Sequence, residues 1–154
     1  DNDERAIFFA KGVVETVKKL NWSPDIIHVH GWMASMVPLY LRKYYADEPL
    51  FSESRIVTSV YGKDFEGELD SQMIDKIAFD GIPKEEIAAL SKPEYNNLLK
   101  VAVDHSDAVI LAAEDLSDDL KSHIDNLSVP VLPYVSLQEA EEAYTNFYNT
   151  EVLK

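Results

Sequence analysis

The sequence predicts an α/β fold, a Rossmann-like three-layer α/β/α arrangement built on a parallel sheet. Three short runs rich in β-branched and other apolar residues predict strands, and apolar residues recur at helical spacing in the stretches between them. Strands that alternate with helices are typical of a parallel sheet with helices on both faces. Because only three strands are clear, we expect residues 1–154 to be a single but partial domain, the later part of a larger one.

The first half of the chain predicts two helices and two strands. Acidic residues at the start and lysines at the end favour a helix over residues 7–20, in agreement with the helix dipole. Strands are predicted over 25–30 and 55–61, where isoleucine and valine dominate. A helix is predicted over 32–45, although Pro38 in its interior requires a kink or a later start.

The second half of the chain predicts a third clear strand and several helices. Residues 69–90 carry weak helical patterns that are interrupted at Gly81-Ile82-Pro83. The remaining elements are a helix over 91–105 with Pro93 early in it, a strand over 107–112, a helix over 115–124, a possible short strand over 129–132 and a helix over 136–148. In the last helix, Ser136 and Glu139 have the spacing of a capping box.

The composition excludes several classes of partner and site. The formal net charge is −14, and so acidic a surface repels phosphate backbones and anionic lipid, so we expect neither nucleic acid nor a membrane as partner. No apolar run approaches the roughly 20 residues of a membrane helix. The chain has no cysteine, which rules out disulfides and thiolate metal sites and is compatible with a reducing compartment.

The four histidines give no metal-binding pattern. His28 and His30 stand two residues apart on a predicted strand, and we expect them to face opposite sides of the sheet. We therefore expect no metal site, and nothing in the sequence calls for a cofactor. The many carboxylates are explained by a solvated surface, and no pair of them stands out as acid and base.

The candidate functional site is the end of the first strand, at His30, Gly31, Trp32 and Met33. Ligands of open parallel sheets bind outside the carboxyl ends of the strands, and Gly31 permits a tight turn there. A purely structural interpretation gives the same residues a strand end, a turn and a tryptophan that packs a helix onto the sheet. The sequence contains no glycine-rich phosphate loop and no G-x-S-x-G nucleophile motif.

Several segments resemble motifs of the bacterial glycogen and plant starch synthase family, and they occur in the family's order. Residues 1–9 are similar to the family's D-N-x-x-R-F-x-x-F segment. Residues 24–34, P-D-I-I-H-V-H-G-W-M-A, resemble P-D-[IV]-[IV]-H-x-H-D-W-H-T, and residues 38–41 resemble the P-x-Y-L that follows it. Residues 97–100 and 106–109 are similar to N-x-L-K and A-D-x-V. The matches extend over about two thirds of the chain.

This resemblance implies a retaining glycosyltransferase of two Rossmann-like domains, which passes glucose from ADP-glucose to an α-1,4-glucan. The matched segments imply the later part of the N-terminal domain, on the side of the glucan acceptor. The family's K-T-G-G-L loop would precede residue 1, and its catalytic glutamate lies in the C-terminal domain. The resemblance therefore implies α-glucan and nucleotide-sugar as ligands, and a bacterial, cytoplasmic protein.

Most polar positions of the family's cleft are replaced in this chain. Gly31 stands where the family has aspartate, and Met33 where it has a sugar-contacting histidine. The family's T-I-H-N strand end matches residues 59–62, so that Tyr61 and Gly62 replace its histidine and asparagine. Methionine cannot supply the hydrogen bond of an imidazole. We therefore expect the chain alone to transfer no glucose.

Two functions remain open from the sequence. The first is an enzyme part, active only together with segments outside this chain. The second is a non-catalytic module that kept the scaffold and binds glucan or a protein. For Trp32 and Phe65 we favour core packing, which leaves Tyr61 as the best exposed aromatic residue for stacking on a sugar ring. An unpaired sheet edge also predicts exposed apolar surface and a homodimer. A third hypothesis is that the chain is a Rossmann-like domain unrelated to the synthase family.

Overall fold

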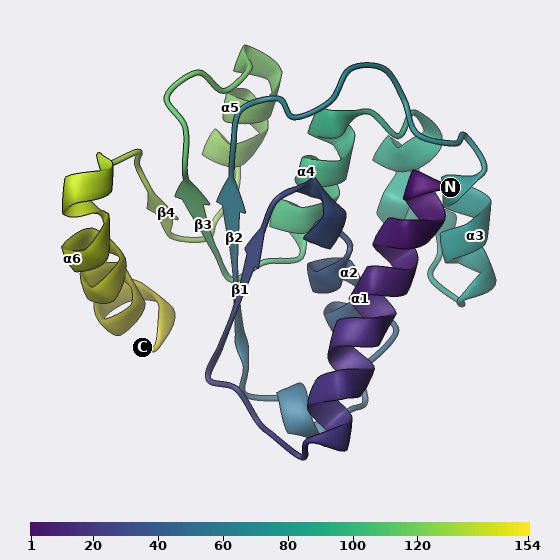
Figure 1. Cartoon of the computed structure of the whole chain (residues 1–154), viewed down its shortest axis with the longest axis horizontal. Coiled ribbons are helices and arrows are strands. Elements are labelled where there is room, and N and C mark those ends of the chain that lie inside the picture. The colour runs from purple at the N-terminus through teal and green to yellow at the C-terminus, as the bar shows by residue number, and fades with distance from the viewer.

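The computed structural model describes residues 1–154 and contains one four-stranded parallel sheet (Figure 1). The strands lie in the order β1-β2-β3-β4, and each pairs in parallel with the next. Their bounds are β1 Ile26–His30, β2 Arg55–Val60, β3 Ala108–Leu111 and β4 Val131–Leu132. The predicted α/β class and all four predicted strands are confirmed, including the short one between two prolines.

Six α-helices and four other helical segments surround the sheet (Figure 1). The α-helices are α1 Asn2–Lys19, α2 Val37–Arg42, α3 Met73–Phe79, α4 Tyr95–Asp104, α5 Asp118–Asp125 and α6 Leu137–Phe147. The others are the 3-10 segments η1 Trp32–Ala34, η2 Pro49–Phe51 and η3 Lys84–Ser91, and the π-helical segment η4 Tyr148–Val152. None of these helices is long and apolar enough to cross a membrane.

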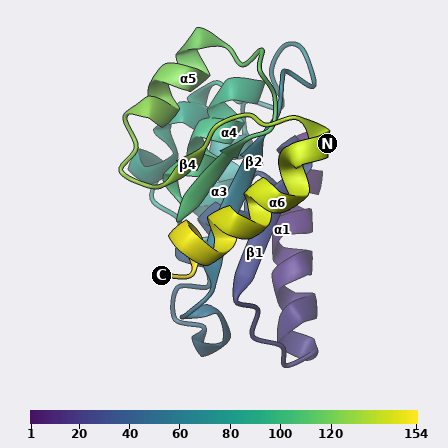
Figure 2. The same cartoon turned by 90° about the vertical axis from the view of Figure 1, so that its left-hand side faces the viewer.

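The two faces of the sheet are covered unequally. Consecutive parallel strands joined by right-handed crossovers place their connecting helices on one side. The core on that side is large: it joins β1 and β2 to α1, α2, α3 and α4 in a cluster of 19 buried residues, and a second cluster joins β2 and β3 to α4 and α5. On the other face, α6 alone crosses the sheet (Figure 2). The predicted three layers are therefore present.

The turn after β1 departs from the continuous helix expected over 32–45. Gly31 has φ 74° and ψ 161°, a conformation open almost only to glycine. The chain then forms η1, and α2 begins only at Val37, so Pro38 lies in the first helical turn. There its missing N–H has no intrahelical partner to lose. The later start that Pro38 required is thus the observed outcome.

Two further helix boundaries refine the predictions. Helix α4 has Glu94 as its N-cap, so Pro93 precedes the helix instead of lying in its first turn. The capping box of α6 is confirmed: the Ser136 backbone N–H donates to Glu139 Oε2 at 3.3 Å, and the Ser136 hydroxyl donates to the same oxygen at 2.7 Å. The helix continues as η4 beyond its predicted end.

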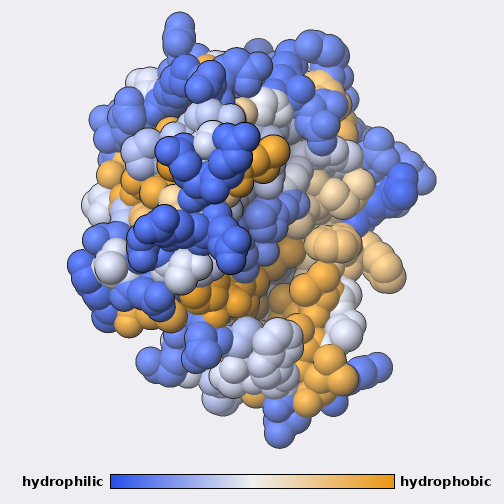
Figure 3. All heavy atoms as spheres, turned by 60° about the vertical axis from the view of Figure 1, so that its left-hand side comes forward, coloured by the Kyte–Doolittle hydropathy of each residue, from blue (hydrophilic) through white to orange (hydrophobic).

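The outer edge of β1 is open, since β1 pairs only with β2. A hollow of about 180 Å³ between α1 and β1 has an apolar lining that includes Val13, Trp22 and Ile27. Trp22, which lines this hollow, is 58% exposed, and Phe8, in a neighbouring groove along α1, is 78% exposed. Figure 3 shows hydrophobic residues gathered in a band between hydrophilic regions of the surface. The expected exposed apolar surface is present along this side of the sheet.

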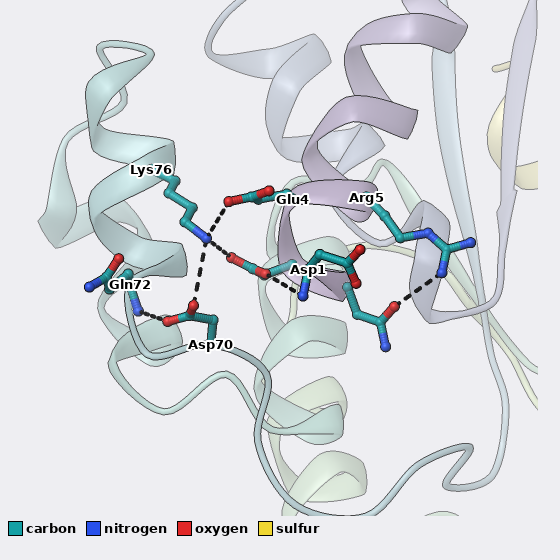
Figure 4. A network of polar contacts seen from close by, with 8 residues as sticks. Asp1, Glu4, Arg5, Asp70, Gln72 and Lys76 are labelled. Atoms are coloured by element: carbon teal, nitrogen blue, oxygen red, sulfur yellow. Dashed lines mark hydrogen bonds and ion pairs between the residues drawn. The ribbon is translucent and has the colours of Figure 1, made fainter.

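A buried carboxylate joins α1 to α3. Asp3 is fully buried, and Lys76 donates to its Oδ2 at 2.6 Å and to Glu4 Oε1 at 2.8 Å; Figure 4 shows Lys76 reaching across to α1. Asp70 Oδ2 lies 3.7 Å from the same ammonium and accepts the Gln72 backbone N–H through its other oxygen. Burial favours the neutral acid, but the hydrogen bond and the charge of Lys76, together with backbone N–H groups at the start of α1, outweigh it and lower the pKa of Asp3.

Replacing Lys76 by methionine should destabilise the fold. The change leaves the Asp3 carboxylate buried without its counter-ion, and such groups are costly. We expect the melting temperature of Lys76→Met to fall by roughly 5 °C. The matched control is Lys84→Met, which breaks an ion pair with Asp75 in which both side chains are more than half exposed. Equal melting temperatures of the two variants would show that the Asp3 contact contributes nothing.

Candidate functional site

His30 and Tyr61 meet where β1 and β2 end. Register places His30 beside Ser59, and the chain then carries Tyr61 to the same edge. His30 Nδ1 lies 2.8 Å from the Tyr61 hydroxyl, and both residues are exposed. Burial lowers the pKa of His30 and raises the pKa of Tyr61. At neutral pH the pair therefore offers uncharged hydrogen-bonding groups, which suit the hydroxyls of a polyol.

The expectation that His28 and His30 face opposite sides of the sheet is wrong. Residues two apart on a strand point to the same face, and the two imidazole rings lie 3.9 Å apart between centroids. His28 Nε2 is 2.7 Å from Ser59 Oγ, and its Nδ1 is hydrogen-bonded to the Tyr148 hydroxyl. Burial, with the neighbouring His30, lowers the pKa of His28 to about 4. No group of three or more His, Asp or Glu side chains is placed to hold a metal ion.

Trp32 packs on the other face of the sheet, away from the histidines. The Trp32 and Phe65 rings pack edge-on with their centroids 5.2 Å apart, and the Phe65 and Tyr95 rings pack edge-on with their centroids 5.6 Å apart. The Tyr95 hydroxyl donates to the Tyr61 carbonyl at 3.1 Å, and burial raises the pKa of Tyr95 to about 12. These contacts hold the loop after β2 against the helices. They support the core-packing interpretation of Trp32 and Phe65.

Met33 lies against α1. It lines one end of an open groove of about 950 Å³ that runs along α1, with Phe8, Phe9 and Val13 among the lining residues. Gly31 shapes the turn and contributes no side chain. The residues at the end of β1 and just after it therefore separate in space: His30 lies at the sheet end, Trp32 packs half-buried against the core, and Met33 lies beside α1.

Gly62 borders a pocket of about 360 Å³ between the ends of β2 and β3. A Cβ on Gly62 would stand 3.2 Å from Asp115 Oδ1, so glycine lets the two loops approach closely. Asn96, at the start of α4, donates from Nδ2 to the hydroxyl of Ser117, which caps α5. Tyr61 also lines the pocket and thus links it to His30. Its polar wall and its size suit a small hydroxyl-bearing ligand.

The structure brings three of the six predicted site residues together, namely His30, Tyr61 and Gly62. Sequence reasoning missed Asn96 and Asp115 as pocket residues. Asp115 could have been found, because it closely follows the third strand, where ligands of parallel sheets bind. Asn96 carries no such signal, since it reaches the pocket only through the packing of α4 beside the sheet. Tyr148 is likewise brought to His28 from the far end of the chain.

Comparison with known proteins identifies the relatives of this chain. A family model described as starch synthase catalytic domain matches residues 1–127. A glycogen synthase of Chlorobium phaeobacteroides is 33% identical over 121 residues, which is 78% of this chain and 24% of the relative. A glycogen synthase of Chlorobium luteolum is 33% identical over 139 residues, 90% of this chain and 26% of the relative.

A more distant relative, a glycogen synthase of Clostridium perfringens, is 28% identical over 124 residues, which is 79% of this chain and 25% of the relative. The chain thus spans about a quarter of the length of the curated relatives it matches. No solved structure matches it significantly.

Proposed function

Because the chain belongs to the family of starch synthase catalytic domains, we propose that it forms the glucan-acceptor side of a glucosyltransferase. In this proposal the complete enzyme passes glucose from ADP-glucose to an α-1,4-glucan, in the bacterial cytoplasm. The 154 residues are one part of a larger Rossmann-like domain and do not catalyse transfer alone. The open β1 edge and the apolar hollow beside it support a larger domain.

The observation that carries the binding role is the His30–Tyr61 pair beside the pocket at the ends of β2 and β3. Tyr61 is 38% exposed, enough for its ring to stack on a sugar face, while its hydroxyl stays bonded to His30. Asn96 and Asp115 offer amide and carboxylate groups to sugar hydroxyls. In this proposal the glucan chain lies across Tyr61 and places one hexose in the pocket.

Isothermal titration with maltoheptaose, and separately with ADP-glucose, tests this function. We expect maltoheptaose to bind and ADP-glucose to bind much more weakly, because the catalytic glutamate and most nucleotide-sugar contacts are expected in a different domain. Binding of neither ligand would reject the proposed acceptor site in this chain.

The Tyr61→Ala substitution should weaken maltoheptaose binding by about 5- to 10-fold. Such a loss is equivalent to roughly 1–1.4 kcal/mol of stacking and hydrogen bonding. Tyr134→Ala is the matched control, since Tyr134 is 41% exposed and lies outside the pocket. An equal affinity for Tyr61→Ala and wild type in the same titration would remove Tyr61 from the site.

A second candidate function is a non-catalytic module that binds a protein, in the first instance another copy of this chain. The observation that favours it is the apolar side of the molecule formed by the β1 edge and α1, where Phe8 is 78% exposed. Exposed apolar surface beside an unpaired strand is typical of an interface. In this proposal two copies bury these surfaces against each other as a homodimer.

The Phe8→Glu substitution should shift that dimer toward monomer, with a dissociation constant raised at least tenfold by a desolvated charge, about 1.4 kcal/mol or more. Sedimentation velocity over a range of concentrations measures the shift. Leu137→Glu is the control, because Leu137 is 93% exposed at the start of α6, on the other side of the sheet. A wild-type protein that stays monomeric at high concentration would reject the dimer.

A further inference from the structure

Helix α6 is attached to the rest of the molecule by few buried groups. Phe147 and Val152 are its buried residues, counting the π-helical extension, whereas the outer surface of α6 is exposed. They meet Val57, Ala108 and Ile110 in a cluster of only five buried residues. Figures 1 and 2 show α6 as a separate layer that crosses the sheet without another helix beside it. Segments with so little buried contact open more readily than the core does.

A chain of hydrogen bonds supplements this small apolar contact. The Tyr148 hydroxyl is bonded to His28 Nδ1, and His28 Nε2 lies 2.7 Å from Ser59 Oγ. The Tyr144 ring approaches His28 with its centroid 6.2 Å away. This chain connects α6 and η4 to β1 and β2 across the second face of the sheet. Because Ser59 is buried and His28 half-buried, breaking these hydrogen bonds would leave their polar groups without a partner unless water reached them.

We propose that α6 and η4 form a detachable strap over the second face of the sheet, and that the Tyr148–His28–Ser59 hydrogen bonds are its latch. Release of the strap uncovers Val57, Ala108 and Ile110 together with His28. The helices on the first face hold the rest of the fold, because their core does not include the strap. The inference does not depend on sugar binding.

Protonation of His28 should release the latch. The titratable groups that face His28 are His30 on β1 and Tyr144 and Tyr148 on the strap, and Tyr61 lies behind His30. No carboxylate or ammonium forms an ion pair with His28. Burial and His30 hold the pKa of His28 near 4 in the closed form, against 6.5 in water. The closed form therefore requires neutral His28. The free energy that favours the closed strap over the open one is lost as the pH falls from 6.5 to 4.

Hydrogen exchange of the complete 154-residue chain tests the strap. We compare protection factors, corrected for intrinsic rates, of amides in α6 with those in α4 between pH 7.5 and pH 4.5. We expect α6 to exchange faster than α4 throughout, and its protection to fall by about 10- to 100-fold toward pH 4.5 while that of α4 stays constant. Equal protection of the two helices at every pH would overturn the proposal.

Tyr148→Phe removes the latch hydroxyl and should reduce α6 protection at pH 7.5 by about fivefold, with α4 unchanged. In the same variant, the pKa of His28 measured by NMR should move up toward 6.5 as water enters. Tyr134→Phe is the matched control, because no hydrogen bond is formed by its hydroxyl. If Tyr148→Phe fails to fold, the pH series on the wild type decides alone. A variant with unchanged α6 protection and unchanged His28 pKa would show that Tyr148 is no latch.

Discussion

The 154-residue chain is expected to transfer no glucose from ADP-glucose to glycogen above a blank. Gly31 and Met33 replace two polar residues of the family's cleft motif, and Met33 lines the groove along α1. Loss of a single preorganised hydrogen-bond donor costs about 2.7–4 kcal/mol of transition-state stabilisation. Several such losses would slow the reaction below detection even with all substrates bound.

Incorporation of radiolabelled glucose into glycogen measures this prediction. The Chlorobium luteolum glycogen synthase, assayed in parallel, controls for the quality of substrates and assay. Transfer by the 154-residue chain, proportional to its concentration, would contradict the prediction. It would also show that His30, Tyr61 and the pocket beside them suffice for chemistry.

Leu98→Ala should lower the free energy of unfolding by about 3 kcal/mol, within the 2–5 kcal/mol found for leucine-to-alanine changes in cores. Leu98 is fully buried on α4, in the cluster of 19 residues that joins four helices to the sheet. The cavity left behind cannot be filled without moving one of these elements. Urea denaturation followed by far-ultraviolet circular dichroism measures the change.

Two comparisons sharpen this experiment. Leu20→Ala, at a position 68% exposed after α1, should change stability by less than about 0.5 kcal/mol. Phe147→Ala removes a larger side chain than Leu98→Ala, yet we expect a smaller global loss, because the strap it anchors can open without unfolding the core. A loss for Phe147→Ala as large as that for Leu98→Ala would place α6 within the cooperative core.

The local elements followed from the sequence because their causes are local. The apolar run from Ile26 to Val29 forms β1, and Ser136 with Glu139 caps α6 as their spacing predicts. Gly31 supplies the turn conformation that other residues avoid. The order of motifs also indicated the family, since the residues that build the sheet are retained while the cleft residues change.

Placement of side chains on the sheet was less predictable. The prediction that His28 and His30 face opposite sides of the sheet was wrong, and strand geometry alone would have placed them on one face. The late start of α2 was predicted only in part. Pro38 indicated a kink or a later start, but it did not fix the residue at which the helix begins. The different locations of the His30, Trp32 and Met33 side chains could not be predicted from the local sequence. They depend on the η1 segment and on which element each side chain contacts.

The sequence by itself determined the order of strands and helices, the turn at Gly31 and membership of the synthase family, because periodicity, caps and motifs act over a few residues. Only the tertiary structure decided which groups meet. Tyr148 reaches His28 across 120 positions of the chain, and Asn96 reaches Ser117 through the packing of α4 against α5. Such contacts depend on how each helix crosses back over the sheet, and no local pattern encodes that path.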